Sequence, residues 1–252
     1  MSQTVQPLLQ VNHLRKNFGA IEAVKDVSFD IEPAEIVAIV GDNGAGKSTV
    51  AKMIAGAYRR DGGEMLWNST PYDPTQPDDA RAIGIETMYQ DLALVNDLDA
   101  AGNIFLNREP MRRIFGVLPV LDRGQMRSRS ADILRRVKIE LPSYDRPVRQ
   151  LSGGQRQAAA LGRILLSDRA RLIIMDEPTA ALGVQEQRKV LDLISSLGEA
   201  GIAIMIISHN LEHVFSVSRR IVVLRGGRLA GVVKTAEVDR QHVVSLIVGG
   251  GA

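Results

Sequence analysis

The sequence contains no cysteine. A chain without cysteine forms no disulfide, carries no thiol nucleophile and builds no zinc–thiolate site. Neither sign of charge predominates: the chain has 31 Lys and Arg and 29 Asp and Glu, which give a formal net charge of +2. This near balance gives no case for a protein that binds nucleic acid through a basic surface. The lack of cysteine fits a reducing compartment, although that signal is weak.

Long apolar runs are missing as well. Stretches such as GIAIMII at 201–207 are among the longest, and none approaches the about 18 residues that a membrane-spanning helix needs. The first residues, MSQTVQPLLQ, lack the basic and apolar regions of a secretion signal. If the protein acts at a membrane, we therefore expect other chains to cross it. The 252 residues, 45% of them apolar, suit one large domain or a domain with an inserted subdomain.

The most informative stretch that is present is GDNGAGKST at 41–49. It follows the apolar run EIVAIV and opens a segment of helical character, so the order is strand, glycine-rich turn, helix. Gly41, Gly46, Lys47 and Ser48 fit the phosphate-loop pattern, in which backbone N–H groups and a helix N-terminus form an anion-binding concavity. Lys47 would reach the β- and γ-phosphates and Ser48 would bind Mg²⁺. The alternative is a glycine turn that binds nothing.

A second apolar run, RLIIMDEP at 171–178, ends in two acids. A carboxylate at the C-terminal end of a strand points into the crevice where open α/β sheets bind ligands. Asp176 is predicted to hold Mg²⁺, through water, and Glu177 to act as the general base that polarises the attacking water. The alternative is an acidic turn that caps the next element.

The string LSGGQ at 151–155 indicates a second anion-binding helix N-terminus. One ATP does not need two such sites from one subunit in the same place. A head-to-tail dimer resolves this, because the phosphate loop of one copy would face Ser152, Gly153 and Gly154 of the other across the γ-phosphate. The alternative is an ordinary glycine-rich turn with a capping serine, but the string is too specific to be expected by chance in the same chain as the phosphate loop.

The remaining patterns predict the order of elements. Alternation favours strands at 8–14 and 24–31, and apolar runs favour strands at 35–40 and 83–90. From about 91 to 150 the strand-like alternation stops, and helical spacing appears at 123–139. From 171 onward strands and helices alternate, which is typical of a parallel α/β sheet. A hairpin around Gly226–Gly227 and a terminal helix over 235–248 complete the prediction.

Over essentially its full length the chain resembles the ATP-binding cassette (ABC) ATPases. GDNGAGKST is similar to their Walker A motif, LSGGQ to their signature and LIIMDEP to their Walker B. The resemblance implies that Gln90 touches Mg²⁺ and reports to a membrane partner, that His209 contacts the γ-phosphate and that Phe18 stacks on adenine. Alone, each of these three residues has an ordinary reading: a surface glutamine, a histidine that packs or caps a turn, and a core phenylalanine.

The resemblance implies an ATP and Mg²⁺ site assembled from many residues. Catalytic roles fall to Lys47, Gln90, Glu177 and His209, and metal binding to Ser48, Gln90 and Asp176. The nucleotide would be held by Phe18, Gly41, Asn43, Gly44, Ala45, Gly46, Lys47, Ser48 and Thr49 of one copy and by Ser152, Gly153, Gly154 and Gln155 of the other.

The implied fold is α/β: a P-loop NTPase with a mixed core sheet, an N-terminal antiparallel β subdomain and an inserted α-helical subdomain. We expect one domain over 1–252. Residues 1–90 and 168–252 would form the nucleotide-binding core with its β subdomain, and 91–167 the inserted helical part that carries the signature.

One departure from the family pattern follows Walker B. The usual Ser-Ala-Leu-Asp is here Ala180, Ala181, Leu182 and Gly183, and the missing aspartate bears on how the two sites of a dimer are coupled. However, PTAALGVQE at 178–186 is similar to the cassettes of bacterial monosaccharide importers, which often carry this glycine. Those importers often fuse two cassettes, whereas this chain has one, so the resemblance implies a homodimer.

We therefore expect the ATPase subunit of a bacterial monosaccharide importer. It would lie peripherally at the cytoplasmic face of the inner membrane, dock a transmembrane permease through the surface from Gln90 to Asn103, and depend indirectly on an extracytoplasmic sugar-binding protein. The alternatives are a cassette for another cargo, such as an amino acid or a lipid, and a non-transport cassette that acts on ribosomes or DNA. The near-neutral charge and the absence of long coiled-coil heptads argue against the last of these.

Overall fold

A ten-stranded sheet runs through the molecule, in the order β5-β4-β1-β2-β12-β11-β3-β10-β9-β6. The structure is a computed structural model that describes residues 6–88, 92–115, 117–136, 139–166, 169–180 and 182–249. Its strands are β1 (Leu9–Phe18), β2 (Ile21–Ile31), β3 (Ile36–Gly41), β4 (Gly62–Trp67), β5 (Thr70–Pro71), β6 (Ile85–Met88), β7 (Met111–Ile114), β8 (Leu118–Leu121), β9 (Leu172–Asp176), β10 (Ala203–Ile207), β11 (Arg220–Arg225) and β12 (Arg228–Lys234).

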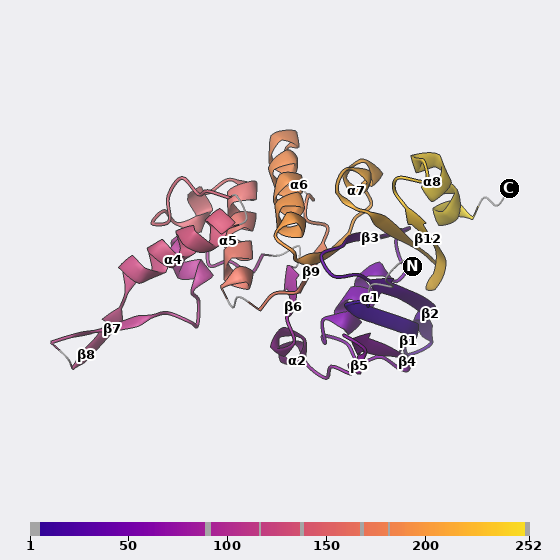
Figure 1. Ribbon diagram of the computed structural model, residues 1–252, viewed down its shortest axis with the longest axis horizontal. Coiled ribbons are helices and arrows are strands. Elements are labelled where there is room, and N and C mark those ends of the chain that lie inside the picture. The colour runs from indigo at the N-terminus through magenta and orange to yellow at the C-terminus, as the bar shows by residue number, and fades with distance from the viewer. Residues whose placement is uncertain are drawn as a thin grey trace.

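Helices cover the sheet and form one arm of the molecule (Figure 1). They are α1 (Lys47–Ile54), α2 (Pro77–Ala82), α3 (Ala100–Ile104), α4 (Arg123–Arg136), α5 (Gly153–Leu165), α6 (Val184–Glu199), α7 (Leu211–Val217), α8 (Arg240–Val248) and a 3₁₀ turn over Val148–Gln150. Within the described residues, no helix has both the length and the apolar character needed to cross a membrane.

The centre of the sheet is parallel and buried on both faces. β10 pairs in parallel with β3 and β9, and the register places Ile207 opposite both Ile39 and Asp176. Strands covered on both faces are expected to be almost entirely apolar, as β3, β9 and β10 are. Because these parallel strands end at the same edge, the loops that follow them all open onto one side of the molecule.

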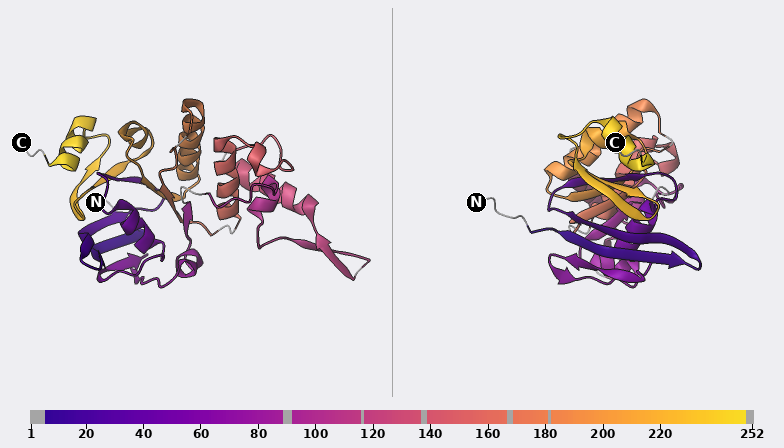
Figure 2. Two further views of the ribbon diagram at one scale, coloured as in Figure 1. Left: turned by 180° about the vertical axis from the view of Figure 1, so that it is seen from behind. Right: turned by 90° about the vertical axis from the view of Figure 1, so that its right-hand side faces the viewer.

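The N-terminal strands form the antiparallel part of the sheet. β1 pairs with both β2 and β4, and β4 pairs with β5. The turned view in Figure 2 shows these long strands crossing below the helices of the core. A single pairing between Arg228 and Asp26 joins β12 to β2 and so links the two parts. The predicted mixed core sheet with an N-terminal antiparallel subdomain is confirmed.

The alternation of side chains along the strands divides the interior into separate cores. Val37 and Ile39 of β3 face a core that α1 shares with β1, β2 and β4. Ala38 and Val40 of the same strand face α7 and α8 instead. A third core covers the other face of β9 and β10 and continues into α3, α4, α5 and α6. The phosphate-loop helix α1 and the signature helix α5 therefore pack in different cores.

The segment expected to be an inserted helical part contains α3, α4 and α5, as its spacing predicts. It also contains the hairpin β7–β8, which the sequence analysis did not predict. Figures 1 and 2 show this hairpin projecting from the end of the helical arm. The terminal helix is shorter than expected, because Asp239 caps α8 by accepting a hydrogen bond from the His242 amide. The division at 90 and 168 stays a prediction.

Candidate functional site

The turn between β3 and α1 has the geometry of an anion cradle. Gly41 ends the strand with φ 153°, and a Cβ built on it would lie 2.2 Å from the Leu224 carbonyl oxygen. Gly46 has φ 99°, and its Cβ would lie 2.7 Å from the Ala23 oxygen. Only glycine fits at either position. The turn thus delivers the chain into α1, whose first N–H groups have no partner within the helix and point into the loop.

Lys47 lies across this loop. Its Nζ donates hydrogen bonds to the carbonyl oxygens of Gly41, at 2.9 Å, and Asp42, at 3.0 Å. The ammonium group is therefore held over the concavity that the amides surround. The rest of the predicted loop is also in place: Ala45 is buried, while Asn43 and Gly44 are exposed and Ser48 and Thr49 are half-buried in the first turn of α1.

Asp176 ends β9 beside this loop. Burial raises the pKa of its carboxyl group, and the hydrogen bond from Ser48 and the charges of Lys52 and Lys47 partly oppose that rise, while Glu177 adds to it. A desolvated carboxylate next to a serine hydroxyl is a suitable oxygen donor set for a hard divalent cation. The sequence analysis predicted both residues as metal ligands, and the structure brings them together.

Glu177 and His209 form a contact at the ends of neighbouring strands β9 and β10. A carboxylate oxygen of Glu177 accepts from the His209 backbone N–H at 3.1 Å and lies 2.8 Å from His209 Nδ1. Glu177 itself has φ 50°, in the left-handed region that a non-glycine residue rarely adopts. Its amide donates to the Ile207 carbonyl, which fixes this backbone. The predicted base and the predicted γ-phosphate contact are thus side by side.

Phe18 and Gln90, which the resemblance placed in the site together with His209, differ in outcome. Phe18 is half-exposed at the end of β1, and its ring meets Tyr58 edge-on with 5.3 Å between the centroids. It is therefore not a core phenylalanine, and the Lys16 ammonium lies over its ring, 5.5 Å from the centroid. Gln90 lies outside the described residues, so its position is not part of the site as described.

The predicted signature caps α5. Ser152 is the N-cap residue: its side chain accepts from the Gln155 backbone amide, and the Ser152 backbone amide donates to the side-chain oxygen of Gln155. The helix begins at Gly153, so the glycine pair forms its first turn instead of preceding it. Figure 1 shows α1 and α5 on opposite sides of β6 and β9. One chain alone does not bring its phosphate loop and its signature together.

Glu186, in the first turn of α6, is a contact that the sequence analysis missed. One carboxylate oxygen accepts from the Gly153 amide at 3.2 Å, and the other accepts from the Gly183 amide at 3.3 Å. It therefore ties the signature to the position where the family usually has aspartate. The spacing of Gly183 and Glu186 matches an N-cap and its third helical residue, and that spacing is the signal that would have found it.

The surface expected to dock a partner is only partly free. Leu92 and Leu94 pack against the helical core, whereas Val95 and Leu98 are exposed. Asn103 fixes the segment between them: its side-chain oxygen accepts from the Val95 amide at 2.7 Å, and its amide group donates to the carbonyls of Val95, Leu98 and Asp99.

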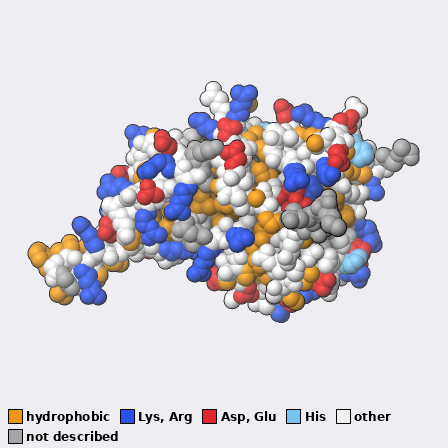
Figure 3. All heavy atoms as spheres, viewed as in Figure 1, with side chains coloured by type: hydrophobic (Ala, Val, Ile, Leu, Met, Phe, Trp, Pro, Cys, Tyr) orange, Lys and Arg blue, Asp and Glu red, His pale blue; other side chains and the backbone are white. Residues whose placement is uncertain are grey.

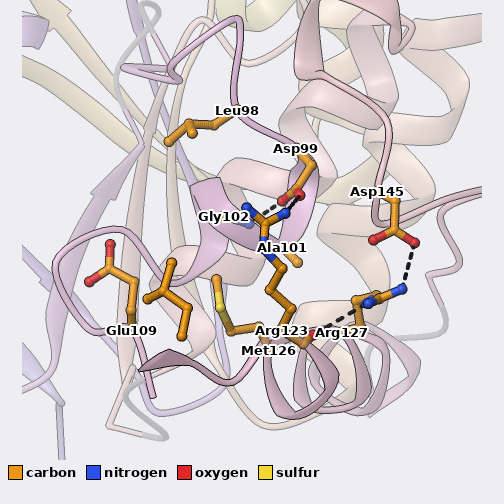
Figure 4. A pocket seen from close by; sticks show the side chains of 10 residues that line it. Leu98, Asp99, Ala101, Gly102, Glu109, Arg123, Met126, Arg127 and Asp145 are labelled. Carbon is orange, nitrogen blue, oxygen red and sulfur yellow. Dashed lines mark hydrogen bonds and ion pairs between the residues drawn. The ribbon is translucent and has the colours of Figure 1, made fainter. Parts of the chain in front are cut away.

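A pocket of about 100 Å³ opens beside Leu98 (Figure 4). Its polar side chains are paired: Asp99 accepts from the Gly102 amide at 2.6 Å and lies 3.8 Å from an Arg123 nitrogen, and Arg127 bonds Asp145 at 3.1 Å. The pocket is lined by Leu98, Asp99, Ala101, Gly102, Glu109, Leu121, Arg123, Met126, Arg127 and Asp145. An apolar floor with ion pairs at its rim is suited to a helix or turn of another protein.

Comparison with known proteins gives a consistent result. The model of the ABC transporter family matches residues 24–180. The xylose/arabinose import ATP-binding protein XylG of Sulfolobus acidocaldarius is 41% identical over 240 residues, which cover 95% of this chain and 93% of that protein. The ribose import ATP-binding protein RbsA 1 of Rubrobacter xylanophilus is 40% identical over 245 residues. These cover 97% of this chain but 48% of that protein, so the chain spans about half of its length.

Solved structures agree with the sequence relatives. The dimeric structure of the ATP-binding cassette MJ0796 in a post-hydrolysis state, bound to ADP and Pi, superposes with a TM-score of 0.71 at 26% identity. The match covers 90% of this chain and 98% of that one. The chain therefore belongs to the ABC transporter family, as one of its ATP-hydrolysing cassettes.

Proposed function

We propose that this cassette powers the import of a monosaccharide by closing on ATP as a homodimer against a transmembrane permease. The observation that carries the proposal is the group of side chains at one edge of the parallel sheet. Lys47 lies over the phosphate loop, Asp176 lies beside Ser48, and Glu177 contacts His209. Each is a residue type that phosphoryl transfer to water requires.

The chain's own residues divide the work. Lys47 and the loop amides bind and orient the β- and γ-phosphates, and Glu177 takes the proton of the attacking water. His209 orients Glu177 and reaches the γ-phosphate, while the exposed ring of Phe18 would stack on adenine. Ser48 and Asp176, joined by Gln90, would hold Mg²⁺, which when bound neutralises charge that develops on the phosphate oxygens.

The homodimer follows from where the signature lies. Ser152, Gly153 and Gly154 begin a helix packed in a different core from the phosphate loop, so they serve the nucleotide of a second copy. The related MJ0796 cassette is dimeric with ADP and Pi. Closure of the two copies is the motion that would act on a permease.

The permease would dock at the pocket beside Leu98, which is reached from the segment that follows Gln90. We place the subunit peripherally at the cytoplasmic face of the inner membrane on this basis. The cargo is inferred from the relatives, which are named for the import of xylose, arabinose and ribose. A sugar-binding protein on the outer side would deliver it.

The test of the site replaces Lys47. Each hydrogen bond from a charged group contributes about 1.5–3 kcal/mol, so Lys47→Ala should weaken ATP binding by about 10- to 100-fold. Lys234→Ala, which removes an exposed lysine on β12, is the matched control. Isothermal titration with a nonhydrolysable ATP analogue measures the loss. Equal affinity in both variants would remove the phosphate loop from the proposed function.

The test of the cargo uses cells of the source organism. Deletion of this chain should abolish uptake of one labelled pentose or hexose, and the wild type should restore it while Glu177→Gln does not. Labelled amino acids serve as the control cargo. Normal uptake of every monosaccharide, together with normal ATPase activity of the purified subunit, would show that the cassette serves another cargo.

A further inference from the structure

The hairpin β7–β8 concentrates exposed apolar side chains as no other part of the described chain does. Of the 14 large apolar side chains that are exposed among the described residues, six lie between 111 and 121. Phe115 is 97% exposed, Val117 81% and Leu118 63%. Single exposed apolar residues are normal on a protein surface, but a contiguous patch marks a contact site.

Register shows that the apolar character surrounds the tip of the hairpin. Residues paired across two strands lie on the same face. Met111 pairs with Leu121 on one face, and Ile114 pairs with Leu118 on the other. Phe115 and Val117 lie in the turn that joins the two strands. A hairpin that lay flat on a protein surface would need only one apolar face, so this one is built to enter an apolar medium end-on.

Positive charge lies immediately behind the tip. Arg112 pairs with Val120 and Arg113 with Pro119, so one arginine stands on each face. Both are exposed. From Pro110 to Leu121 the sequence has no acid, and Glu109 and Asp122 stand only at the base. Space-filling atoms show the apolar end of the arm with basic side chains beside it (Figure 3).

This order of charge and apolar surface matches an anionic lipid layer. Phe115 follows Arg112 and Arg113 by three and two residues, so the tip lies at most about 7–10 Å beyond them along the strand direction, which lets the tip enter the lipid layer while the arginines stay among the headgroups. Arginine side chains reach back to the headgroup level when their neighbours are buried. Each basic residue near an anionic surface strengthens binding about fivefold.

The base of the hairpin lies at the proposed permease site. Leu121 and Glu109 line the same pocket beside Leu98 that is proposed above for the permease. If the permease lies there, a point on which this inference rests on the proposed function, the hairpin stands beside the permease and therefore near the bilayer in which the permease is embedded. We propose that the tip formed by Ile114, Phe115, Val117 and Leu118 inserts into the anionic lipid surface next to the permease, with Arg112 and Arg113 at the headgroups.

The first experiment uses the lack of cysteine. Single variants Phe115→Cys and Val248→Cys place one environment-sensitive fluorophore either at the tip or at an exposed site on α8. Vesicles of phosphatidylcholine with 30% phosphatidylglycerol, a composition chosen to be about as anionic as a cytoplasmic leaflet, are then added. We expect a blue shift and a rise in intensity at position 115 and no change at 248. No shift at 115 overturns the inference.

The second experiment separates the two contributions by vesicle co-sedimentation. Phe115→Ser with Leu118→Ser should lower binding at least tenfold, whereas the matched pair Val244→Ser and Val248→Ser on α8 should not. Arg112→Gln with Arg113→Gln should lower binding to the anionic vesicles about 25-fold, from two factors of about five, and Arg228→Gln with Arg240→Gln should have little effect. Equal binding to pure phosphatidylcholine contradicts the role of charge.

Other occupants of the tip are separate outcomes. Self-association without lipid or nucleotide that the Phe115→Ser, Leu118→Ser variant removes would show a second copy there. Tip-dependent binding only to permease-containing nanodiscs of neutral lipid would show a protein partner. Either result overturns lipid insertion. Basal ATPase activity, unchanged in the hairpin variants, is measured in parallel, so that undiminished vesicle binding by the Phe115→Ser, Leu118→Ser variant with normal ATPase activity rejects this inference alone.

Discussion

At the scale of single residues, the contact between Glu177 and His209 determines what the site can do. Glu177→Gln keeps the shape of the side chain and an oxygen for the His209 amide, but removes the basic group. General bases contribute about 10²–10⁴-fold in rate, so turnover should fall by that factor while ATP binding and an ATP-stabilised dimer persist. Turnover and gel filtration with ATP measure both effects. Glu212→Gln, an exposed acid on α7, is the control, and normal turnover in Glu177→Gln would assign the base elsewhere.

The ionised carboxylate of Asp176, which would bind Mg²⁺, should lower the stability of the fold. Burial raises the pKa of its carboxyl group, so its ionised form is less favourable in the fold than in the unfolded chain, and stability falls as the pH rises through that pKa. Asp176→Asn should therefore raise the melting temperature of the nucleotide-free protein at pH 8 and abolish Mg²⁺-dependent hydrolysis. The gain should shrink at acid pH, where wild-type Asp176 takes up a proton. A lower melting temperature for the variant at pH 8 would contradict this account.

At the scale of elements, Glu186 connects α5 and α6 through the amides of Gly153 and Gly183. Glu186→Ala removes both acceptors. At about 1 kcal/mol for each hydrogen bond, the free energy of unfolding should fall by about 2 kcal/mol, and ATP-driven dimer formation should weaken because the signature turn is no longer held. Urea titration and gel filtration measure the two effects. Glu186→Gln keeps one acceptor oxygen and should recover part of the stability and part of the dimer formation. If the two variants do not differ, the hydrogen bonds of Glu186 contribute to neither property.

The elements differ in how well the sequence predicts them. β3, β9 and β10 are buried on both faces, so their apolar runs mark them without knowledge of the fold. β7 and β8 were missed because both faces are exposed and apolar and basic residues are mixed on each, which leaves no alternation to detect. α8 was predicted too long because Thr235 to Val238 look compatible with a helix, while the Asp239 cap fixes the actual start.

The site shows the same limit. Lys47, Ser48, Asp176 and Glu177 could be predicted because each belongs to a contiguous motif whose chemistry is local. Their mutual distances, the left-handed backbone of Glu177 and the reach of Glu186 to Gly153 depend on how β9, α5 and α6 pack. Those contacts join residues far apart in the chain, which spacing alone does not describe.

At the scale of the whole molecule, the signature should act on the nucleotide of the partner copy. A Cβ built on Gly154 meets nothing closer than 3.9 Å, and an acid in the first turn of a helix is favourable. Gly154→Asp should thus fold normally and bind ATP in the single subunit. It should fail to dimerise or hydrolyse, because its charge opposes the γ-phosphate of the partner's ATP.

Gly154→Asn separates charge from size in that experiment. The neutral variant has nearly the same volume, so it should retain part of the dimerisation that the acid abolishes. Analytical ultracentrifugation with ATP compares the two directly. If Gly154→Asp hydrolyses ATP at the normal rate, the signature does not face a second nucleotide.

The left-handed backbone of Glu177 has a consequence for any attempt to improve this protein by selection. Glycine or asparagine adopts φ 50° more readily than glutamate does, so a library screened only for heat resistance should enrich those two residues at this position. The selected variants would resist heat better but would lack ATP turnover. Directed evolution of this cassette therefore needs a screen for turnover in every round, since resistance to heat and activity select opposite residues at 177.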